Sequence, residues 1–350
     1  MSKIRVLVVD DSPVYRKIIT NALNRDPQIE VIGTAENGKI AIDLIKRLNP
    51  DVITLDLEMP EMDGLETLDR LKRSNSNVSV IVFSSHSYAG AKMTFDALEK
   101  GAFDFVPKPS NGSFSENLNK IFSLLVPKIK VCYLNKSSVS LKKATKRDKP
   151  DIKPLSLPIK RRDAVAIGVS TGGPSALKEI FSKLSLQISV PIFVVQHMPP
   201  LFTSQFAKRL DSLSPLKVKE AENAEQVKGG VIYLAPGDYH MELNNEDGKI
   251  RIRLHKGPPE NNCRPSVDVL FRSVAKVYNG KTLAVILTGM GSDGLKGARL
   301  LKEKGAYIIA QDKATSVVWG MPKAIVDAGL ADKILPLSQV PNAISDLVRK

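Results

Sequence analysis

Short apolar runs alternate with helix-length segments along most of this 350-residue chain, and this alternation limits the folds open to it. In the first half, the apolar runs are Ile4–Val9, Val31–Ala35, Val52–Leu55, Val80–Ser84 and Phe103–Val106. Strands that are separated by crossover helices lie parallel in one sheet. Residues 1–126 are therefore predicted to form a doubly wound, parallel α/β domain.

The same alternation resumes after Asp163. Strands are predicted at Ala164–Val169, Pro191–Gln196, Val231–Leu234, Ile250–Leu254, Thr282–Thr288 and Tyr307–Gln311. Helical patterns follow the first of these runs and cover Val269–Tyr278. Because domains usually hold about 100–200 residues, the length fits two of them. Residues 164–350 are predicted to be a second, Rossmann-like α/β domain with a mostly parallel sheet.

The positive charge is concentrated between the two predicted domains. The chain has a formal net charge of +14, and residues 127–163 hold 12 basic and 3 acidic residues. This segment is rich in Lys, Ser and Pro and lacks a clear hydrophobic period after Val131. We interpret residues 127–163 as a basic, flexible linker that repels itself. A nucleic-acid-binding arm is the less favoured reading, and we expect no nucleic-acid partner.

The composition also indicates the cellular compartment in which we expect the protein to act. No apolar run reaches the roughly 18–20 residues that span a bilayer, and the first residues lead straight into a strand without a secretory signal. The two cysteines, Cys132 and Cys263, lie far apart and lack metal-ligand spacing. We therefore expect a reduced, cytoplasmic protein without membrane insertion.

Polar residues of the first half fall at the carboxyl ends of its predicted strands, where open α/β sheets place their sites. They are Asp10, Asp11, Asp56, Ser84 and Lys108. Three carboxylates that converge repel one another unless a cation joins them, and oxygen-only ligands suit Mg²⁺. Each acid alone could be a helix cap, but all five residues together predict a magnesium site formed by the three aspartates.

In the second half, the stretch from Gly168 to Gly173 places a serine between glycines at a strand-to-helix turn. Glycine lets the backbone turn where a side chain would clash, so Ser170 is expected at an exposed strand end. Pro174 suits the first turn of the next helix. Ser170 is then a nucleophile, part of a phosphate cradle, or a simple helix cap.

Two further residues of catalytic type follow predicted strands. His197 ends the run from Pro191, and Asp293 lies in the glycine-rich turn after Thr288. A serine nucleophile needs a base, which His197 would supply, and the base needs an orienting acid, which Asp293 would supply. Backbone amides at Thr171 and Met290 are candidates for an oxyanion hole.

Structural readings remain open for each residue of this set. A lone histidine at a strand end is often only hydrogen-bonded, and Asp293 could be a turn residue. His240 and His255 are rival bases, of which His240 ranks second to His197. Cys263 has no apparent activating partner in the sequence and is read as passive.

Residues 1–126 resemble a response-regulator receiver domain, which has the flavodoxin-like fold. The resemblance rests on Val8–Ser12, on Leu55–Gly64 and on Val106–Pro109. It implies that Asp56 accepts a phosphoryl group and that Asp10 and Asp11 help to hold Mg²⁺. It also implies that Lys108 contacts the phosphoryl group and that Ser84 is the hydroxyl switch.

Residues 164–350 resemble the catalytic domain of CheB-type chemotaxis protein-glutamate methylesterases. The matching segments are Gly168–Pro174, Val194–Met198, Arg264–Phe271, Leu287–Gly294 and Thr315–Pro322. The resemblance implies a Ser170–His197–Asp293 triad that hydrolyses glutamyl methyl esters of chemoreceptor cytoplasmic domains, releases methanol and deamidates receptor glutamines. It implies no cofactor for the esterase reaction and a chemotaxis-type histidine kinase as phosphodonor. An interface between the receiver and the catalytic domain would restrain the esterase until Asp56 is phosphorylated.

Two other functions compete with this reading. A DNA-binding response regulator would explain the receiver and the positive charge, but the second half reads as a large α/β unit with scattered basic residues. A nucleotide- or phosphate-binding module would explain the glycine-rich turn. That turn lacks the Gly-Lys-Ser/Thr ending of a P-loop and the full Gly-x-Gly-x-x-Gly spacing.

Overall fold

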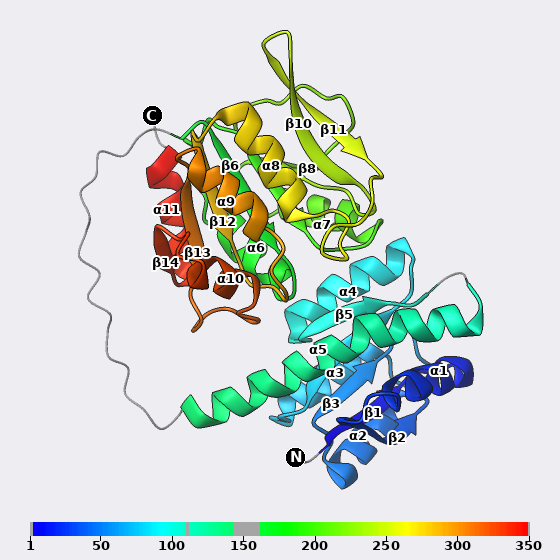
Figure 1. Cartoon of the computed structure of the whole chain (residues 1–350). Coiled ribbons are helices and arrows are strands. Elements are labelled where there is room, and N and C mark those ends of the chain that lie inside the picture. The colour runs from blue at the N-terminus through cyan, green and yellow to red at the C-terminus, as the bar shows by residue number, and fades with distance from the viewer. Residues whose placement is uncertain (1–2, 110–111, 143–161, 349–350) are drawn as a thin grey trace. The chain divides into compact units, whose positions relative to one another are not determined.

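A computed structural model of the chain describes residues 3–109, 112–142 and 162–348, and it divides into two compact units (Figure 1). The first unit alternates strands and helices. Its elements are β1 (Ile4–Val9), α1 (Pro13–Leu23), β2 (Ile29–Ala35), α2 (Gly38–Leu48), β3 (Val52–Leu55), α3 (Gly64–Arg73), β4 (Ser79–Ser84), α4 (Tyr88–Lys100), β5 (Asp104–Pro107) and α5 (Phe114–Lys142).

The first sheet has the order β2-β1-β3-β4-β5, and every neighbouring pair is parallel. The central strands are buried on both faces, as β-branched runs such as Val52–Leu55 require. Helix α1 packs beside α5, while α3 packs against both α2 and α4. The predicted doubly wound parallel sheet is therefore confirmed for this unit.

The last helix of this unit corrects the predicted linker. Helix α5 continues through Pro127 and ends at Lys142, so residues 127–142 are helical and do not belong to a flexible linker. Ile129 and Cys132 are buried in the core that α5 shares with α1 and the sheet. Burial of these side chains outweighs the tendency of proline to end a helix. The predicted boundary at residue 126 is too early, and residues 143–161 of the predicted linker lie outside the described part.

The second unit is a larger α/β domain. Its elements are β6 (Ala164–Val169), α6 (Gly173–Phe181), β7 (Ile192–Gln196), α7 (Phe202–Asp211), β8 (Lys217–Glu220), β9 (Val231–Leu234), β10 (His240–Glu246), β11 (Lys249–His255), α8 (Val267–Tyr278), β12 (Thr282–Ile286), α9 (Leu295–Glu303), β13 (Tyr307–Gln311), α10 (Met321–Asp327), β14 (Lys333–Leu335), the 3-10 turn η1 (Leu337–Gln339) and α11 (Val340–Val348).

Seven parallel strands form the second sheet, in the order β14-β13-β12-β6-β7-β9-β8. The core on one side joins the sheet to α8 and α9 and extends to the β10–β11 hairpin. The strand predicted at Ile250–Leu254 therefore exists, but it belongs to this antiparallel hairpin and not to the main sheet. In the described part of the chain, no helix combines the length and the apolar character that a membrane span needs.

Candidate functional site

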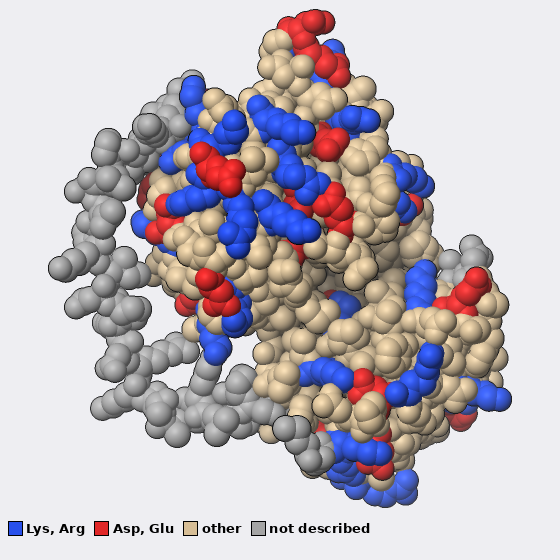
Figure 2. Space-filling view, viewed as in Figure 1, with Lys and Arg blue, Asp and Glu red and all other residues tan. Residues whose placement is uncertain are grey.

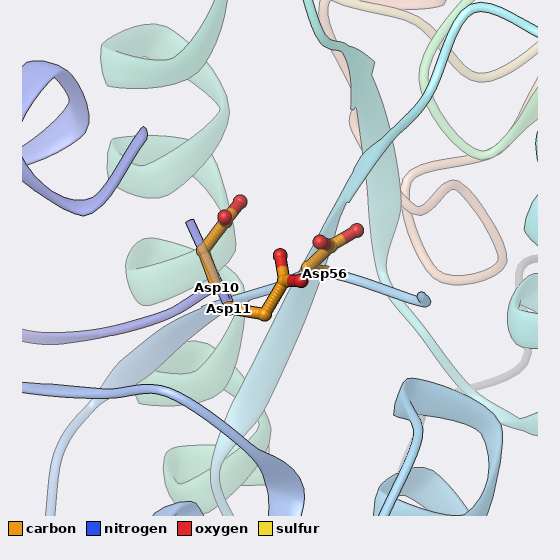
Figure 3. Close-up of side chains that lie close together, drawn as sticks. All are labelled: Asp10, Asp11 and Asp56. Carbon is orange, nitrogen blue, oxygen red and sulfur yellow. The ribbon is translucent and has the colours of Figure 1, made fainter. Parts of the chain in front are cut away.

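The first cluster of polar side chains lies at the carboxyl ends of β1 and β3, which are neighbours in the first sheet. Asp10 and Asp11 follow β1, and Asp56 follows β3 (Figure 3). One carboxylate oxygen from each lies within 4.8 Å of the others. Asp10 and Asp56 are buried, whereas Asp11 is exposed. The sheet order thus brings together the three predicted carboxylates.

Lys108 joins this cluster from the end of β5. Its Nζ lies 2.6 Å from Asp56 Oδ2 and 2.9 Å from Asp10 Oδ2, and it also lies 4.6 Å from the centre of the Tyr15 ring. Burial alone would lower the pKa of Lys108, but the two carboxylates raise it above its usual value, so the ammonium stays charged. Burial raises the pKa of Asp56 to about 6 even though Lys108 opposes that shift.

The donor set fits a small hard cation. All three side chains offer oxygen, which is the ligand type that Mg²⁺ takes. Asp10 Oδ2 is buried and accepts no hydrogen bond among the described residues, although the Lys108 ammonium is close to it. A cation beside this oxygen would compensate a buried charge that the protein alone satisfies only in part.

Ser84 lies in this neighbourhood with its hydroxyl turned toward α4. Ser84 Oγ is 3.1 Å from the carbonyl oxygen of Gly90 and 2.7 Å from Thr94 Oγ1. These contacts hold the hydroxyl against the helix. The sequence locates Ser84 at the end of β4 correctly, but it does not reveal this orientation.

The second cluster lies at the carboxyl ends of β12, β6 and β7, three consecutive strands in the centre of the second sheet. Ser170 follows β6 directly, His197 follows β7, and Asp293 lies in the loop after β12. The Ser170 backbone is fixed on both sides, because its N–H donates to the Thr288 carbonyl (3.0 Å) and its carbonyl accepts from Gln196 Nε2 (3.0 Å).

Two glycines make this turn possible. Gly172 has a φ of 79°, in the left-handed region that side chains rarely adopt. A Cβ on Gly173 would lie 1.8 Å from Gln196 Oε1, so any side chain there would displace the glutamine that holds Ser170. Helix α6 then begins at Gly173, with Pro174 in its first turn as predicted.

His197 and Asp293 form a direct pair. His197 Nε2 lies 2.8 Å from Asp293 Oδ2, and their side chains are 12% and 3% exposed. The two residues are distant in sequence and meet because β7 and β12 flank β6. The predicted base and orienting acid are thus brought together.

Asp293 accepts many further hydrogen bonds. The donors are Ser266 Oγ (2.8 Å), Val267 N (2.7 Å), Asp268 N (3.1 Å), Gly294 N (3.0 Å) and Asn261 Nδ2 (2.7 Å). Burial alone would raise the pKa of Asp293, but the bonds from His197 and from these donors lower it to about 2. The carboxylate is therefore ionised, and it also caps the N-terminus of α8.

The remaining ring nitrogen of His197 faces a thiol. Cys263 Sγ lies 3.5 Å from His197 Nδ1. Burial lowers the pKa of His197, but the bond to Asp293 and the contact with Cys263 outweigh it and raise the pKa to about 9. Because the ionised Asp293 can only accept, Nε2 carries the proton and Nδ1 is the basic nitrogen of the neutral ring.

Ser170 is close to this pair in the fold but is not bonded to it. Among the described residues, no hydrogen bond links Ser170 Oγ to His197. The backbone N–H groups of Thr171 and Met290 likewise have no acceptor in the described part of the chain, whereas Gly289 N–H donates to the Val318 carbonyl. The two predicted oxyanion donors are thus uncommitted.

The two rival histidines, His240 and His255, make hydrogen bonds that hold the local structure together. His240 is 1% exposed, its Nδ1 accepts from Ser266 N at 3.2 Å, and its Nε2 lies 3.0 Å from the Pro258 carbonyl oxygen. Burial is the main cause that lowers the pKa of His240 and keeps it neutral. His255 Nδ1 accepts from Gly257 N. Neither histidine has a hydrogen bond to Asp293 in the described part of the chain.

Sequence reasoning missed the residues that support Asp293. Asn261 bridges two buried carboxylates, since its Nδ2 lies 2.7 Å from Asp293 Oδ1 and 3.0 Å from Asp268 Oδ2. The only sequence signal near these residues is the helical pattern predicted over Val269–Tyr278. The sequence shows no activating partner for Cys263, yet in the structure Cys263 lies against His197.

These folds and clusters define a class of protein first: a response regulator, in which a receiver domain precedes an α/β effector domain. The model of the response regulator receiver domain matches residues 6–118, and that of the CheB methylesterase matches residues 165–344. The chain belongs to the CheB methylesterase family. It is a protein-glutamate methylesterase, an ester hydrolase of two-component chemotaxis signalling.

Relatives match along the whole chain. A protein-glutamate methylesterase/protein-glutamine glutaminase of Nocardioides sp. is 46% identical over 100% of this chain and 97% of its own length. One from Trichodesmium erythraeum is 46% identical over 98% of this chain and 99% of its own length. The crystal structure of the Thermotoga maritima CheB methylesterase catalytic domain is 49% identical and covers 54% of this chain and 100% of its own, with a TM-score of 0.53.

Proposed function

We propose that Ser170, His197 and Asp293 form the catalytic triad of an esterase that demethylates glutamyl methyl esters on chemoreceptor cytoplasmic domains. The observation that carries this proposal is the 2.8 Å pair between His197 and Asp293, at strand ends on either side of Ser170. The two alternative functions, a DNA-binding response regulator and a nucleotide- or phosphate-binding module, are not favoured, because the second unit belongs to an esterase family.

The reaction begins with His197 Nδ1 taking the Ser170 proton while Ser170 Oγ attacks the ester carbonyl. Asp293 keeps the Nε2 proton in place and stabilises the imidazolium that forms. Collapse of the tetrahedral intermediate expels the methoxy group, which leaves as methanol with the proton from His197. His197 then deprotonates a water that hydrolyses the acyl-enzyme, and a glutamate carboxylate is released. With a glutamine substrate, ammonia leaves instead.

Charge that develops on the carbonyl oxygen needs donors. The backbone N–H groups of Thr171 and Met290 are proposed as these donors because neither is committed within the described residues. Loss of one donor of this kind raises the activation barrier by about 2.7–4 kcal/mol. The hydrolysis uses no cofactor in this scheme.

For the first unit, we propose that Asp56 accepts a phosphoryl group from a chemotaxis-type histidine kinase. Asp10, Asp11 and Asp56 would hold Mg²⁺, which offsets the negative charge of the group in transfer. The Lys108 ammonium, 2.6 Å from Asp56, would contact the new phosphate. Ser84 would leave its contacts on α4 to donate its hydroxyl to that phosphate.

We further propose that phosphorylation of Asp56 raises the esterase rate, so that the receiver restrains the catalytic domain through an interface within the chain. Such interfaces are modest in area, and a few kcal/mol can open them. Chemoreceptor cytoplasmic domains as substrates and a kinase as phosphodonor imply that the protein acts in the cytoplasm.

The test is methanol release from methylated receptor membranes, with and without a small phosphodonor. Ser170→Ala should abolish methanol release while Asp56 still takes up phosphate in the presence of Mg²⁺. Turnover that survives in Ser170→Ala would reassign the nucleophile. For the regulation, residues 164–350 should act faster than the unphosphorylated whole chain, and equal rates would refute the restraint.

A further inference from the structure

A basic surface lies on the second unit beside the proposed active site. Helices α8 and α9 pack side by side, and Figure 2 shows Lys and Arg side chains gathered over them. The surface is defined here by Lys276 of α8, Lys296 and Arg299 of α9, and Lys304 just after α9. All four residues are exposed. We call it the basic α8–α9 face.

The two helices pack against each other and are linked near both ends. Near their starts, Gly297 N donates to Asp268 Oδ1 at 2.7 Å. Near their ends, Arg162 Nη1 donates to the carbonyl oxygens of Gly280 and Gly305, both at 3.0 Å. The four cations therefore lie on or just after two packed helices that hydrogen bonds link near both ends.

Within the described residues, none of the four cations makes an ion pair, whereas two neighbours do: Arg272 pairs with Glu260, and Lys302 pairs with Asp332. Glu303 is the one exposed acid on α9 itself. Unpaired cations held close together raise the local positive potential, which attracts an anionic partner and speeds its association.

One end of this face lies near the proposed active site. Asp293 accepts hydrogen bonds from the first residues of α8, and α9 begins just after Asp293. Lys296 is thus separated from the proposed orienting acid only by the start of α9. The start of α9 therefore brings the basic face close to the residues proposed to act on the ester.

We propose that the basic α8–α9 face binds an acidic stretch of the polypeptide substrate while its ester is at the active site. This inference rests on the proposed function, because it assumes that the esterase acts on a polypeptide near Ser170. The chemistry favours such a partner: the demethylated product of every turnover is itself a glutamate carboxylate, so a substrate with several sites becomes more acidic as it is processed. Oppositely charged surfaces increase association rates and fix register.

The experiment compares two variants of the whole chain that change net charge equally. Lys296→Glu/Arg299→Glu reverses the face, and the control Lys228→Glu/Lys249→Glu reverses two exposed lysines remote from it in the sequence, on the loop before β9 and on the hairpin. The substrates are a soluble, methylated receptor cytoplasmic fragment and 4-nitrophenyl acetate. Folding of each variant is checked by its melting temperature.

We expect the face variant to lose about tenfold in kcat/KM for the receptor fragment at low salt, mainly through KM, while the small ester is hydrolysed as by the wild type. The control should behave as the wild type with both substrates, and added salt should narrow the difference. Equal kcat/KM of the face variant and the control on the fragment would overturn the proposal.

Two other outcomes are distinguishable. If the wild type hydrolyses the small ester but not the methylated fragment, the proposed function fails on its own. If the wild type binds vesicles of anionic phospholipid and the face variant loses that binding without a change in fragment turnover, the face contacts lipid and the proposal is wrong.

Discussion

Cys263 Sγ lies 3.5 Å from Nδ1 of His197, the ring nitrogen opposite the one that bonds Asp293. The proposed mechanism needs this same Nδ1 to take the proton of Ser170. The thiol therefore occupies the position at the base that the serine hydroxyl must reach. The His197 ring thus lies between the Asp293 carboxylate and the Cys263 thiol. Ser170 Oγ would compete with Cys263 Sγ for the hydrogen bond at Nδ1.

The first prediction concerns this thiol. Cys263→Ala removes a contact that raises the pKa of His197, so the histidine should become neutral at lower pH. The pH at which kcat/KM reaches half its maximum should fall, and activity at pH 7 should rise. Cys263→Ser, which keeps a polar group of similar size, should lie between the alanine variant and the wild type.

The measurement is the pH profile of small-ester hydrolysis for the three proteins. A lower rate with an unshifted profile in Cys263→Ala would mean that the thiol only fills space. Complete loss of turnover in both variants, with intact melting curves, would instead make Cys263 the nucleophile and contradict the role of Ser170.

The second prediction is the pH dependence of the wild type. His197 acts as a base only when it is neutral, and its pKa is raised to about 9. kcat/KM should therefore rise about tenfold per pH unit between pH 7 and pH 9 and then level off. A histidine with an ordinary pKa would level off near pH 6.5. Initial rates with Ser170→Ala as the blank separate this rise from chemical hydrolysis.

The same shift has a consequence for stability. The folded state binds the His197 proton more tightly than the unfolded chain does, because the folded pKa is the higher one. The stabilisation from this group is complete below the unfolded pKa of about 6.5 and is lost as the pH rises through about 9. The free energy of unfolding of the second unit should decline over that range, and denaturant titrations at several pH values measure it.

Much of this fold could be predicted because buried parallel strands are continuous runs of apolar residues in the sequence. Ala164–Val169, for example, is buried at every residue, so its sequence reads as a strand without tertiary information. Residues that follow such strands meet at one sheet edge, and this is why Asp10, Asp56 and Lys108 could be grouped. The His197–Asp293 pair followed from the same reasoning.

Other features depend on tertiary contacts that no local pattern carries. Pro127 signals a helix end, yet α5 passes through it because Ile129 and Cys132 find a core. The orientation of Ser84 depends on Thr94 in α4, and the charge of Asp293 depends on donors from a distant loop, Asn261 among them. Which side chains become partners across the fold depends on how the whole chain packs, and no short segment of the sequence determines that packing.

The third prediction separates the two roles of Asp293. Asp293→Asn removes the negative charge that fixes the His197 tautomer, so kcat for ester hydrolysis should fall by about 10³–10⁴. Ser266→Ala removes one of several donors to the carboxylate and should cost less than tenfold. The melting temperature reports whether residue 293 still caps the N-terminus of α8. Loss of that cap lowers the free energy of unfolding by about 1–2 kcal/mol. Asp293→Asn with activity within tenfold of the wild type would exclude Asp293 from the triad.

The fourth prediction concerns the close approach between β6 and α8. A Cβ on Gly168 would lie 2.4 Å from Val267 Cγ1, well inside van der Waals contact. Val267 is the first residue of α8, and its N–H donates to Asp293 at 2.7 Å. Gly168→Ala should push this turn away from the sheet, which destabilises the second unit by about 1–3 kcal/mol and disturbs the acid that orients His197.

Calorimetry should show a fall of about 2–10 °C in the melting temperature of the second unit, together with a lower kcat. The matched test is Gly168→Ala/Val267→Ala, in which the smaller side chain makes room for the new methyl group. The double variant should be less destabilised than the sum of the two single changes, and part of kcat should return. Additive losses would show that the contact between Gly168 and Val267 does not control the position of Asp293.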